Sequence, residues 1–142
     1  TAGVTIAVMA DYSFVVLDWY RGRPGLTGQI RAIQEAADKW EPNVIGIESV
    51  AYQAVLARHL MRRTALPIVP LRPDKDKVRR ALAMLPYVEE KRVKVHQNVW
   101  PLVEVLTAFP YGEEDDSVDA FVYAMELAVR YGRKARRVVE GV

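Results

Sequence analysis

The sequence predicts an α/β domain in which a central mixed sheet of about five strands is flanked by helices. Three features support this class: two adjacent runs rich in β-branched and aromatic residues, a short apolar run at 44–48, and amphipathic stretches of helical period that separate and follow the strands. The chain has 142 residues, of which 51% are hydrophobic, enough for the core of one ordinary domain. We therefore expect residues 1–142 to form a single domain.

The predicted strands begin with a hairpin. Residues 4–10 and 13–20 are the two β-branched runs, and the short break at Asp11 and Tyr12 is typical of a tight turn. Residues 44–48 form a continuously apolar run, as expected for a buried central strand, and 66–71 form another short strand. Residues 92–96 alternate cation and valine, which indicates an edge strand whose charges guard its outer face.

The helices are predicted from apolar residues recurring at helical spacing. They are expected near residues 27–40, 52–63, 78–85, 98–109 and 117–131. Pro86 should end the third of them, because proline lacks the N–H that a helix interior requires. A basic tail follows Gly132. Neither an internal repeat nor a second domain is evident.

Composition excludes several classes of protein. The chain has no cysteine, so disulfides and thiolate–zinc sites play no part, and two histidines make a zinc site improbable. No apolar run reaches the roughly 18 to 20 residues of a membrane span, so we expect a soluble protein. The net charge is only +2, but basic clusters surround a small acidic focus. That pattern suits a metal enzyme that binds a polyanion.

The acidic focus lies just before the last predicted helix. Glu113, Glu114, Asp115 and Asp116 are consecutive, and Asp119 follows one turn later. In one interpretation Asp116 caps the helix, Asp119 complements its dipole, and the preceding acids form a solvated loop. In the other, the carboxylates hold a divalent metal, since hard cations such as Mg²⁺ prefer clustered carboxylate oxygens. The cluster alone does not decide between them.

Glu48 is a candidate partner for this cluster. It ends the apolar run at 44–48, and ligands of open α/β sheets bind beyond the carboxyl ends of the strands. The alternative is that Glu48 has reached solvent or pairs with an arginine. A metal-binding role is the interpretation that we prefer.

A basic junction precedes the third predicted helix. Its cations are Lys75, Lys77, Arg79 and Arg80. Such a run is commonly solvated surface, but four cations on one loop-to-helix junction also suit contacts with the phosphates of DNA. Both interpretations remain open.

Several motifs together resemble one family. Ile45-Gly46-Ile47-Glu48, the stretch Asp76-Lys77-Val78-Arg79-Arg80-Ala81, and Phe109-Pro110-Tyr111-Gly112 leading into Asp115-Asp116-Ser117-Val118-Asp119-Ala120 resemble the C-terminal nuclease domain of bacteriophage large terminase subunits. The segment at 16–23 is similar to the second strand of that family, so the resemblance spans nearly the whole chain. It implies the RNase H-like fold of the RuvC-like nuclease superfamily.

The resemblance also implies a function. It indicates a metal-dependent endonuclease that cuts concatemeric viral double-stranded DNA, while an ATPase motor domain of the same polypeptide packages it. Glu48, Asp116 and Asp119 match the family's catalytic acids, with Asp115 as a possible further ligand of a two-metal site that takes Mg²⁺ or Mn²⁺. The implied partners are DNA, the motor domain, the portal and the small terminase subunit. The implied location is the cytoplasm of the infected bacterial host, without a membrane.

Two departures from the family keep rival functions open. Glu114 stands where many relatives have His, and the first catalytic Asp of the family, on the first strand, has no counterpart after Thr1. We expect that strand to lie upstream, so that the chain is a fragment of a larger ATPase–nuclease polypeptide. The rivals are a RuvC-like Holliday-junction resolvase and a nuclease-dead module for DNA binding or assembly.

Overall fold

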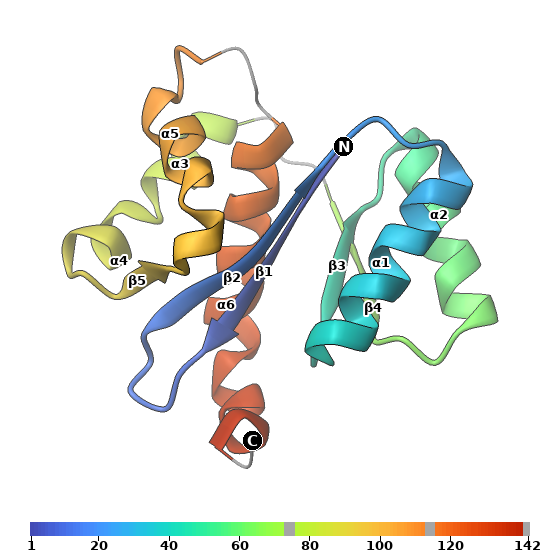
Figure 1. The fold of residues 1–142 in the computed structure, drawn as a ribbon, viewed down its shortest axis with the longest axis horizontal. Coiled ribbons are helices and arrows are strands. Elements are labelled where there is room, and N and C mark those ends of the chain that lie inside the picture. Colours follow the sequence, from blue (N-terminus) through green and yellow to red (C-terminus); the bar gives the residue numbers. More distant parts are fainter. Residues whose placement is uncertain (73–75, 113–115, 141–142) are drawn as a thin grey trace. The chain divides into compact units, whose positions relative to one another are not determined.

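The structure is a computed structural model that describes residues 1–72, 76–112 and 116–140. The chain divides into two compact units, one formed by Thr1–Gly22 with Asp76–Val142 and the other by Arg23–Lys75. Each unit is described by itself below, and a single domain stays a prediction. The α-helices and strands are labelled in Figure 1.

The first unit contains one sheet and most of the helices. Its elements are β1 (Ala2–Val8), β2 (Phe14–Arg21), α3 (Lys77–Leu82), α4 (Leu85–Glu89), β5 (Val93–Val95), the 3₁₀ helix η1 (Gln97–Val99), α5 (Pro101–Ala108) and α6 (Asp116–Glu140). The strand order is β1-β2-β5, with β1 antiparallel and β5 parallel to β2. The predicted hairpin and the predicted edge strand are therefore both confirmed.

The hairpin turn is held by its own side chains. The hydroxyl of Ser13 donates to Asp11 Oδ1 at 2.6 Å, and the Ser13 backbone N–H donates to the same oxygen at 2.9 Å. These hydrogen bonds favour the charged carboxylate and lower the pKa of Asp11. Tyr12 takes a left-handed conformation at φ 62°. Asp11 thus has a structural role in closing the turn.

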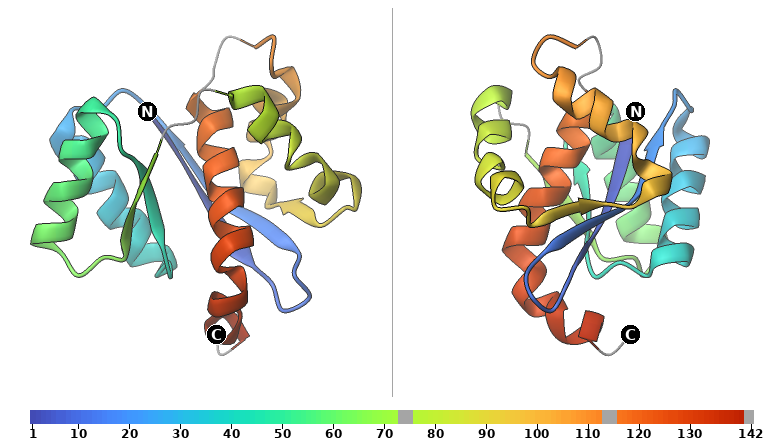
Figure 2. Two further views of the ribbon diagram at one scale, coloured as in Figure 1. Left: turned by 180° about the vertical axis from the view of Figure 1, so that it is seen from behind. Right: turned by 60° about the vertical axis from the view of Figure 1, so that its left-hand side comes forward.

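Helix α6 packs on the sheet and forms the centre of the unit's core. Val118, Phe121, Val122 and Met125 are buried in one cluster with Val8, Phe14 and Val16 of the strands. In Figures 1 and 2, α6 runs alongside the β1–β2 hairpin. A Cβ added to Gly132 would lie 3.1 Å from a methyl carbon of Val8, so a glycine is suited to this close approach. The helix continues past Gly132 to Glu140, beyond the predicted end at residue 131.

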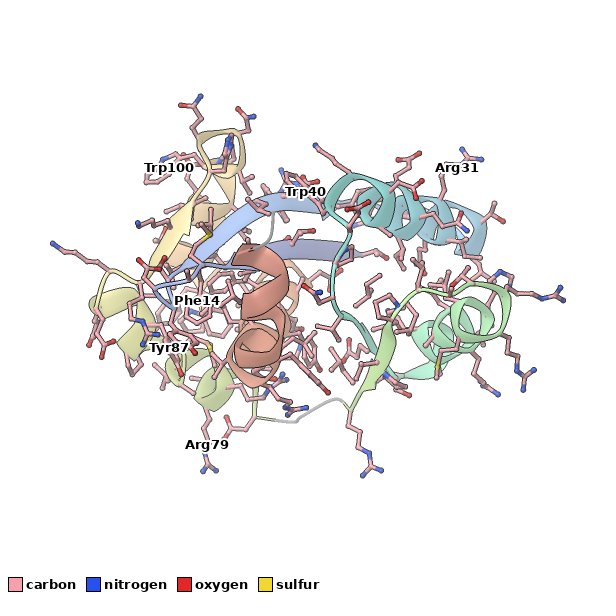
Figure 3. The ribbon with its side chains drawn as sticks, turned by 90° about the horizontal axis from the view of Figure 1, so that it is seen from below. Phe14, Arg31, Trp40, Arg79, Tyr87 and Trp100 are labelled. Carbon is pink, nitrogen blue, oxygen red and sulfur yellow. The ribbon has the colours of Figure 1, made fainter. Side chains whose placement is uncertain are left out.

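The helices between β2 and α6 depart from prediction at their prolines. The predicted helix at 78–85 ends instead at Leu82, and Pro86 lies in the first turn of α4. A proline is tolerated there, because the first-turn N–H groups have no partner within the helix. Phe14 and Tyr87 meet edge to face at 5.6 Å, and both are labelled in Figure 3. The guanidinium of Arg92 lies over both rings and donates to the carbonyl of Tyr12.

The second unit alternates helix and strand. Its elements are α1 (Leu26–Trp40), β3 (Ile45–Glu48), α2 (Ala51–Arg63) and β4 (Ile68–Leu71). Strands β3 and β4 are parallel, with Glu48 opposite Leu71. Its core comprises Ile47, Leu56, Ala57, Leu60 and Ile68, with α1 residues such as Ile30 and Ile33 packed against it.

The predicted strands are divided between the two units of the chain. Five strands are present near the predicted positions, but they form a three-stranded and a two-stranded sheet. Among the described residues no strand pairs with both β1 and β3, and a sheet is continuous only where neighbouring strands exchange backbone hydrogen bonds. Also within those residues, no helix is long and apolar enough to cross a bilayer.

The core of the second unit yields a matched test of packing. Leu60 is 0% exposed and the next residue in α2, Met61, is 51% exposed. Leu60→Ala should lower the free energy of unfolding by about 2 to 5 kcal/mol, because it leaves a cavity, whereas Met61→Ala should change it by less than about 1 kcal/mol. Urea unfolding measures both. Equal losses in the two variants would contradict the burial of Leu60.

Candidate active site

The candidate site is built on the first turn of α6. Ser117 and Val118 are buried there, and the Trp19 indole N–H of β2 donates to Ser117 Oγ at 3.0 Å. This hydrogen bond fixes the rotation of the helix relative to the sheet. Asp116 and Asp119 are three residues apart and consequently share the face that Ser117 and Val118 do not use.

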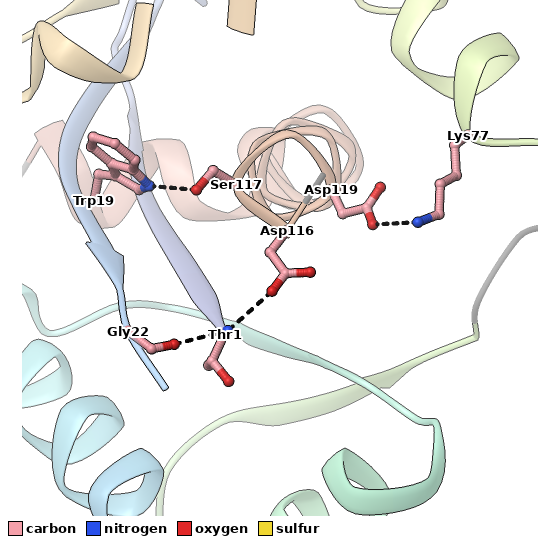
Figure 4. Close-up of polar contacts among 7 residues, drawn as sticks. All are labelled: Thr1, Trp19, Gly22, Lys77, Asp116, Ser117 and Asp119. Carbon is pink, nitrogen blue, oxygen red and sulfur yellow. Dashed lines mark hydrogen bonds and ion pairs between the residues drawn. The ribbon is translucent and has the colours of Figure 1, made fainter. Parts of the chain in front are cut away.

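Each of the two aspartates has a nitrogen close by, as Figure 4 shows. Asp116 Oδ2 lies 3.0 Å from the backbone nitrogen of Thr1, which also lies 3.0 Å from the carbonyl oxygen of Gly22. Asp119 Oδ2 lies 3.0 Å from Lys77 Nζ of α3. The side chain of Asp116 is 67% exposed and that of Asp119 is 24% exposed. Asp116 is therefore open to solvent, whereas Asp119 is partly buried.

Helix α3 is held against α6 by a second polar contact. The guanidinium of Arg80 makes two hydrogen bonds to the Glu126 carboxylate, at 2.9 and 2.8 Å, and lies 4.2 Å from the centre of the Tyr123 ring. These hydrogen bonds raise the pKa of Arg80 above its ordinary value. Asp76 caps α3 by accepting from the backbone N–H of Arg79 at 3.0 Å. The start of α3 is thereby placed beside Asp119.

The remaining predicted site residues lie in different surroundings. Arg79 is exposed, and its side chain extends away from the ribbon in Figure 3. Glu48 is partly buried at the carboxyl end of β3, in the other unit, so its approach to the aspartates stays a prediction. Asp115 and Lys75 lie outside the described residues. The DNA-binding role of the basic junction is likewise untested.

The donor set fits a hard divalent cation in part. Mg²⁺ commonly takes one or two carboxylates and completes its coordination with waters and substrate phosphates, and Asp116 with Asp119 offer such a pair. Within residues 1–72, 76–112 and 116–140, no group of three or more acidic or histidine side chains is placed to hold a metal. Glu48 and Asp115 stay predictions as further ligands.

Sequence reasoning missed the pairing between α3 and α6. It offered two interpretations of Lys77 and Arg80, solvated surface or contacts for DNA, whereas both residues pair with acids of α6. A signal was present: Lys77 and Arg80 are three residues apart, and Asp119 and Glu126 are seven apart, so each pair shares one helix face. The role of Ser117 as the acceptor for Trp19 was also missed.

Comparison with known proteins gives one family. The family model described as "Terminase RNaseH-like domain" matches residues 1–128. Among solved structures, the crystal structure of the yeast mitochondrial Holliday junction resolvase Ydc2 is similar, with 12% sequence identity and a TM-score of 0.45 over 99% of this chain and 84% of that chain. No curated protein matches the chain.

The clamp between Arg80 and Glu126 should be measurable as a coupling energy. In a double-mutant cycle of Arg80→Ala and Glu126→Ala, we expect about 1 to 2 kcal/mol, because the guanidinium side chain is only 13% exposed and its hydrogen bonds are bidentate. The more exposed pair of Glu90 and Arg92, 3.5 Å apart, is the control and should give about 0.5 kcal/mol or less. Urea unfolding of the seven proteins, with the parent shared by both cycles, measures both couplings. Equal couplings would refute a special role for the clamp.

Proposed function

The chain belongs to the terminase RNase H-like domain family, and on that premise we propose that it is a divalent-metal-dependent endonuclease that cuts concatemeric viral double-stranded DNA during genome packaging. Membership gives it the RNase H-like fold and places it among the RNase H-like nucleases. The observation that carries the proposal is the pair of outward-facing aspartates, Asp116 and Asp119, on the first turn of α6.

The proposed metal ligands are Asp116 and Asp119, together with Glu48 and possibly Asp115. When bound, a pair of Mg²⁺ or Mn²⁺ ions would activate a water molecule and stabilise the leaving oxygen of the phosphodiester. The protein contributes fixed ligand positions. Ser117 and its hydrogen bond from Trp19 hold the first turn of α6 against β2, which sets the backbone positions of the two aspartates.

The proposed DNA contacts come from the basic junction. Lys75, Lys77, Arg79 and Arg80 would neutralise backbone phosphates that a cluster of carboxylates would otherwise repel. Arg79 is the member best placed for this, because it is exposed and its hydrogen bond with Asp76 uses the backbone N–H and not the guanidinium. Contacts of this kind hold the duplex without reading its sequence.

The setting of the reaction also belongs to the proposal. An ATPase motor domain in the same polypeptide would drive DNA past this nuclease, and the portal and small terminase subunit would complete the machine. The reaction would take place in the cytoplasm of an infected bacterial host. Membership of the family is what supports this part of the proposal.

Conservative substitution of the acids tests the enzyme function. Asp116→Asn and Glu48→Gln should each reduce Mn²⁺-dependent nicking of supercoiled plasmid by at least about a hundredfold, because each keeps its shape but loses the charge that a metal requires. Asp38→Asn, which alters an exposed acid of α1, is the control and should nick like the parent. Normal nicking by Asp116→Asn would refute its catalytic role.

Substrate form separates the proposal from its rivals. Cleavage confined to four-way junctions, with linear and supercoiled duplex left intact, would favour a resolvase. DNA binding without metal-dependent cleavage would favour an assembly module. The terminase function requires cutting of unbranched duplex.

The role of Arg79 in DNA binding is testable by salt titration. Arg79→Ala should weaken binding to unrelated duplexes about equally, and should reduce the slope of log K against log salt by roughly 0.9, the value for one lost phosphate contact. Arg31→Ala, an exposed arginine of α1, serves as the matched control with the parent slope expected. An unchanged slope for Arg79→Ala would remove this residue from the DNA path.

A further inference from the structure

Lys77 lies against one carboxylate oxygen of Asp119, a proposed metal ligand. Its ammonium lies 3.0 Å from Asp119 Oδ2, within the same unit of the fold. The Lys77 side chain is about half exposed, whereas Asp119 is the less exposed of the two aspartates. The Lys77 ammonium thus already pairs with Asp119, which is a proposed metal ligand.

The packing of α3 explains why Lys77 is there. Arg80, three residues further along α3, is clamped to Glu126 and Tyr123 of α6. Because Lys77 and Arg80 share one face of α3, the clamp also directs Lys77 toward α6. The contact with Asp119 therefore follows from how two helices dock, and it does not depend on a flexible lysine alone.

We propose that Lys77 is the resident counter-cation of Asp119 in the metal-free protein, and that a divalent ion must displace it to bind. This rests on the proposed function, since it assigns a regulating role at the same site. Two cations cannot both approach one carboxylate oxygen closely without repelling each other. Once displaced, the Lys77 ammonium has a DNA phosphate as its natural new partner.

Competition between Lys77 and the metal should change the affinity for Mn²⁺ by a measurable amount. A unit charge held about 6 Å from a divalent ion weakens its binding by about tenfold even at the dielectric constant of water. Lys77→Met should therefore bind Mn²⁺ about tenfold more tightly than the parent at low ionic strength. Lys77→Arg keeps the charge and should not gain affinity.

The experiment measures Mn²⁺ binding to the 142-residue chain without DNA, by the electron paramagnetic resonance signal of the free ion. Lys94→Met, which removes an exposed lysine of β5, is the control for net charge. Circular dichroism melting confirms that each variant is folded, and Lys77→Gln provides a second neutral variant should Lys77→Met fold poorly.

The possible outcomes separate this proposal from the function on which it rests. Tighter Mn²⁺ binding by Lys77→Met or Lys77→Gln, with parent-like binding by Lys77→Arg and Lys94→Met, supports the competition. Equal binding by all of these variants overturns the role of Lys77 but leaves the metal site intact. An absence of Mn²⁺ binding in the parent and in every variant contradicts the metal-dependent function itself, and this proposal with it.

Discussion

The site depends on the way the first turn of α6 is fixed to the sheet. Ser117 and Val118 are buried, and Trp19 of β2 donates a hydrogen bond to the Ser117 hydroxyl. A helix has only one rotation that buries these two residues, and that rotation turns Asp116 and Asp119 outward. The position of the acids is consequently set by the hydrophobic core, while their own mutual repulsion opposes it.

Cations of α3 lie against the acids of α6 and offset part of their negative charge. Arg80 is held by Glu126 and Tyr123, and Lys77 lies against Asp119. The same helix thus supplies a structural clamp in Arg80, a counter-charge for Asp119 in Lys77, and an exposed cation in Arg79. A short helix that docks through charge in this way links the folding of the unit to the chemistry proposed for it.

Local patterns predicted much of this structure, and long-range pairing accounts for what they missed. The hairpin, the edge strand 93–95 and the strand that ends at Glu48 follow from residue types along the chain. The division into two sheets does not, because strand pairing joins residues far apart in sequence. Pro86 predicts the end of a helix, but proline also suits the first turn of a helix, and Pro86 lies in the first turn of α4. The acids Asp116 and Asp119 were found by their density and spacing, but their contacts depend on how α3 packs.

The central claim is that Glu48, Asp116 and Asp119 converge on one metal centre. A crystal of the chain grown with Mn²⁺ and a short DNA duplex, measured at the manganese absorption edge, locates the ions directly. The account predicts anomalous peaks within about 2 to 2.5 Å of carboxylate oxygens of both Asp119 and Glu48, with any paired ions about 3.5 to 4 Å apart. Manganese bound elsewhere, or Glu48 more than about 10 Å from both aspartates, well beyond the span of a two-metal centre, would contradict it.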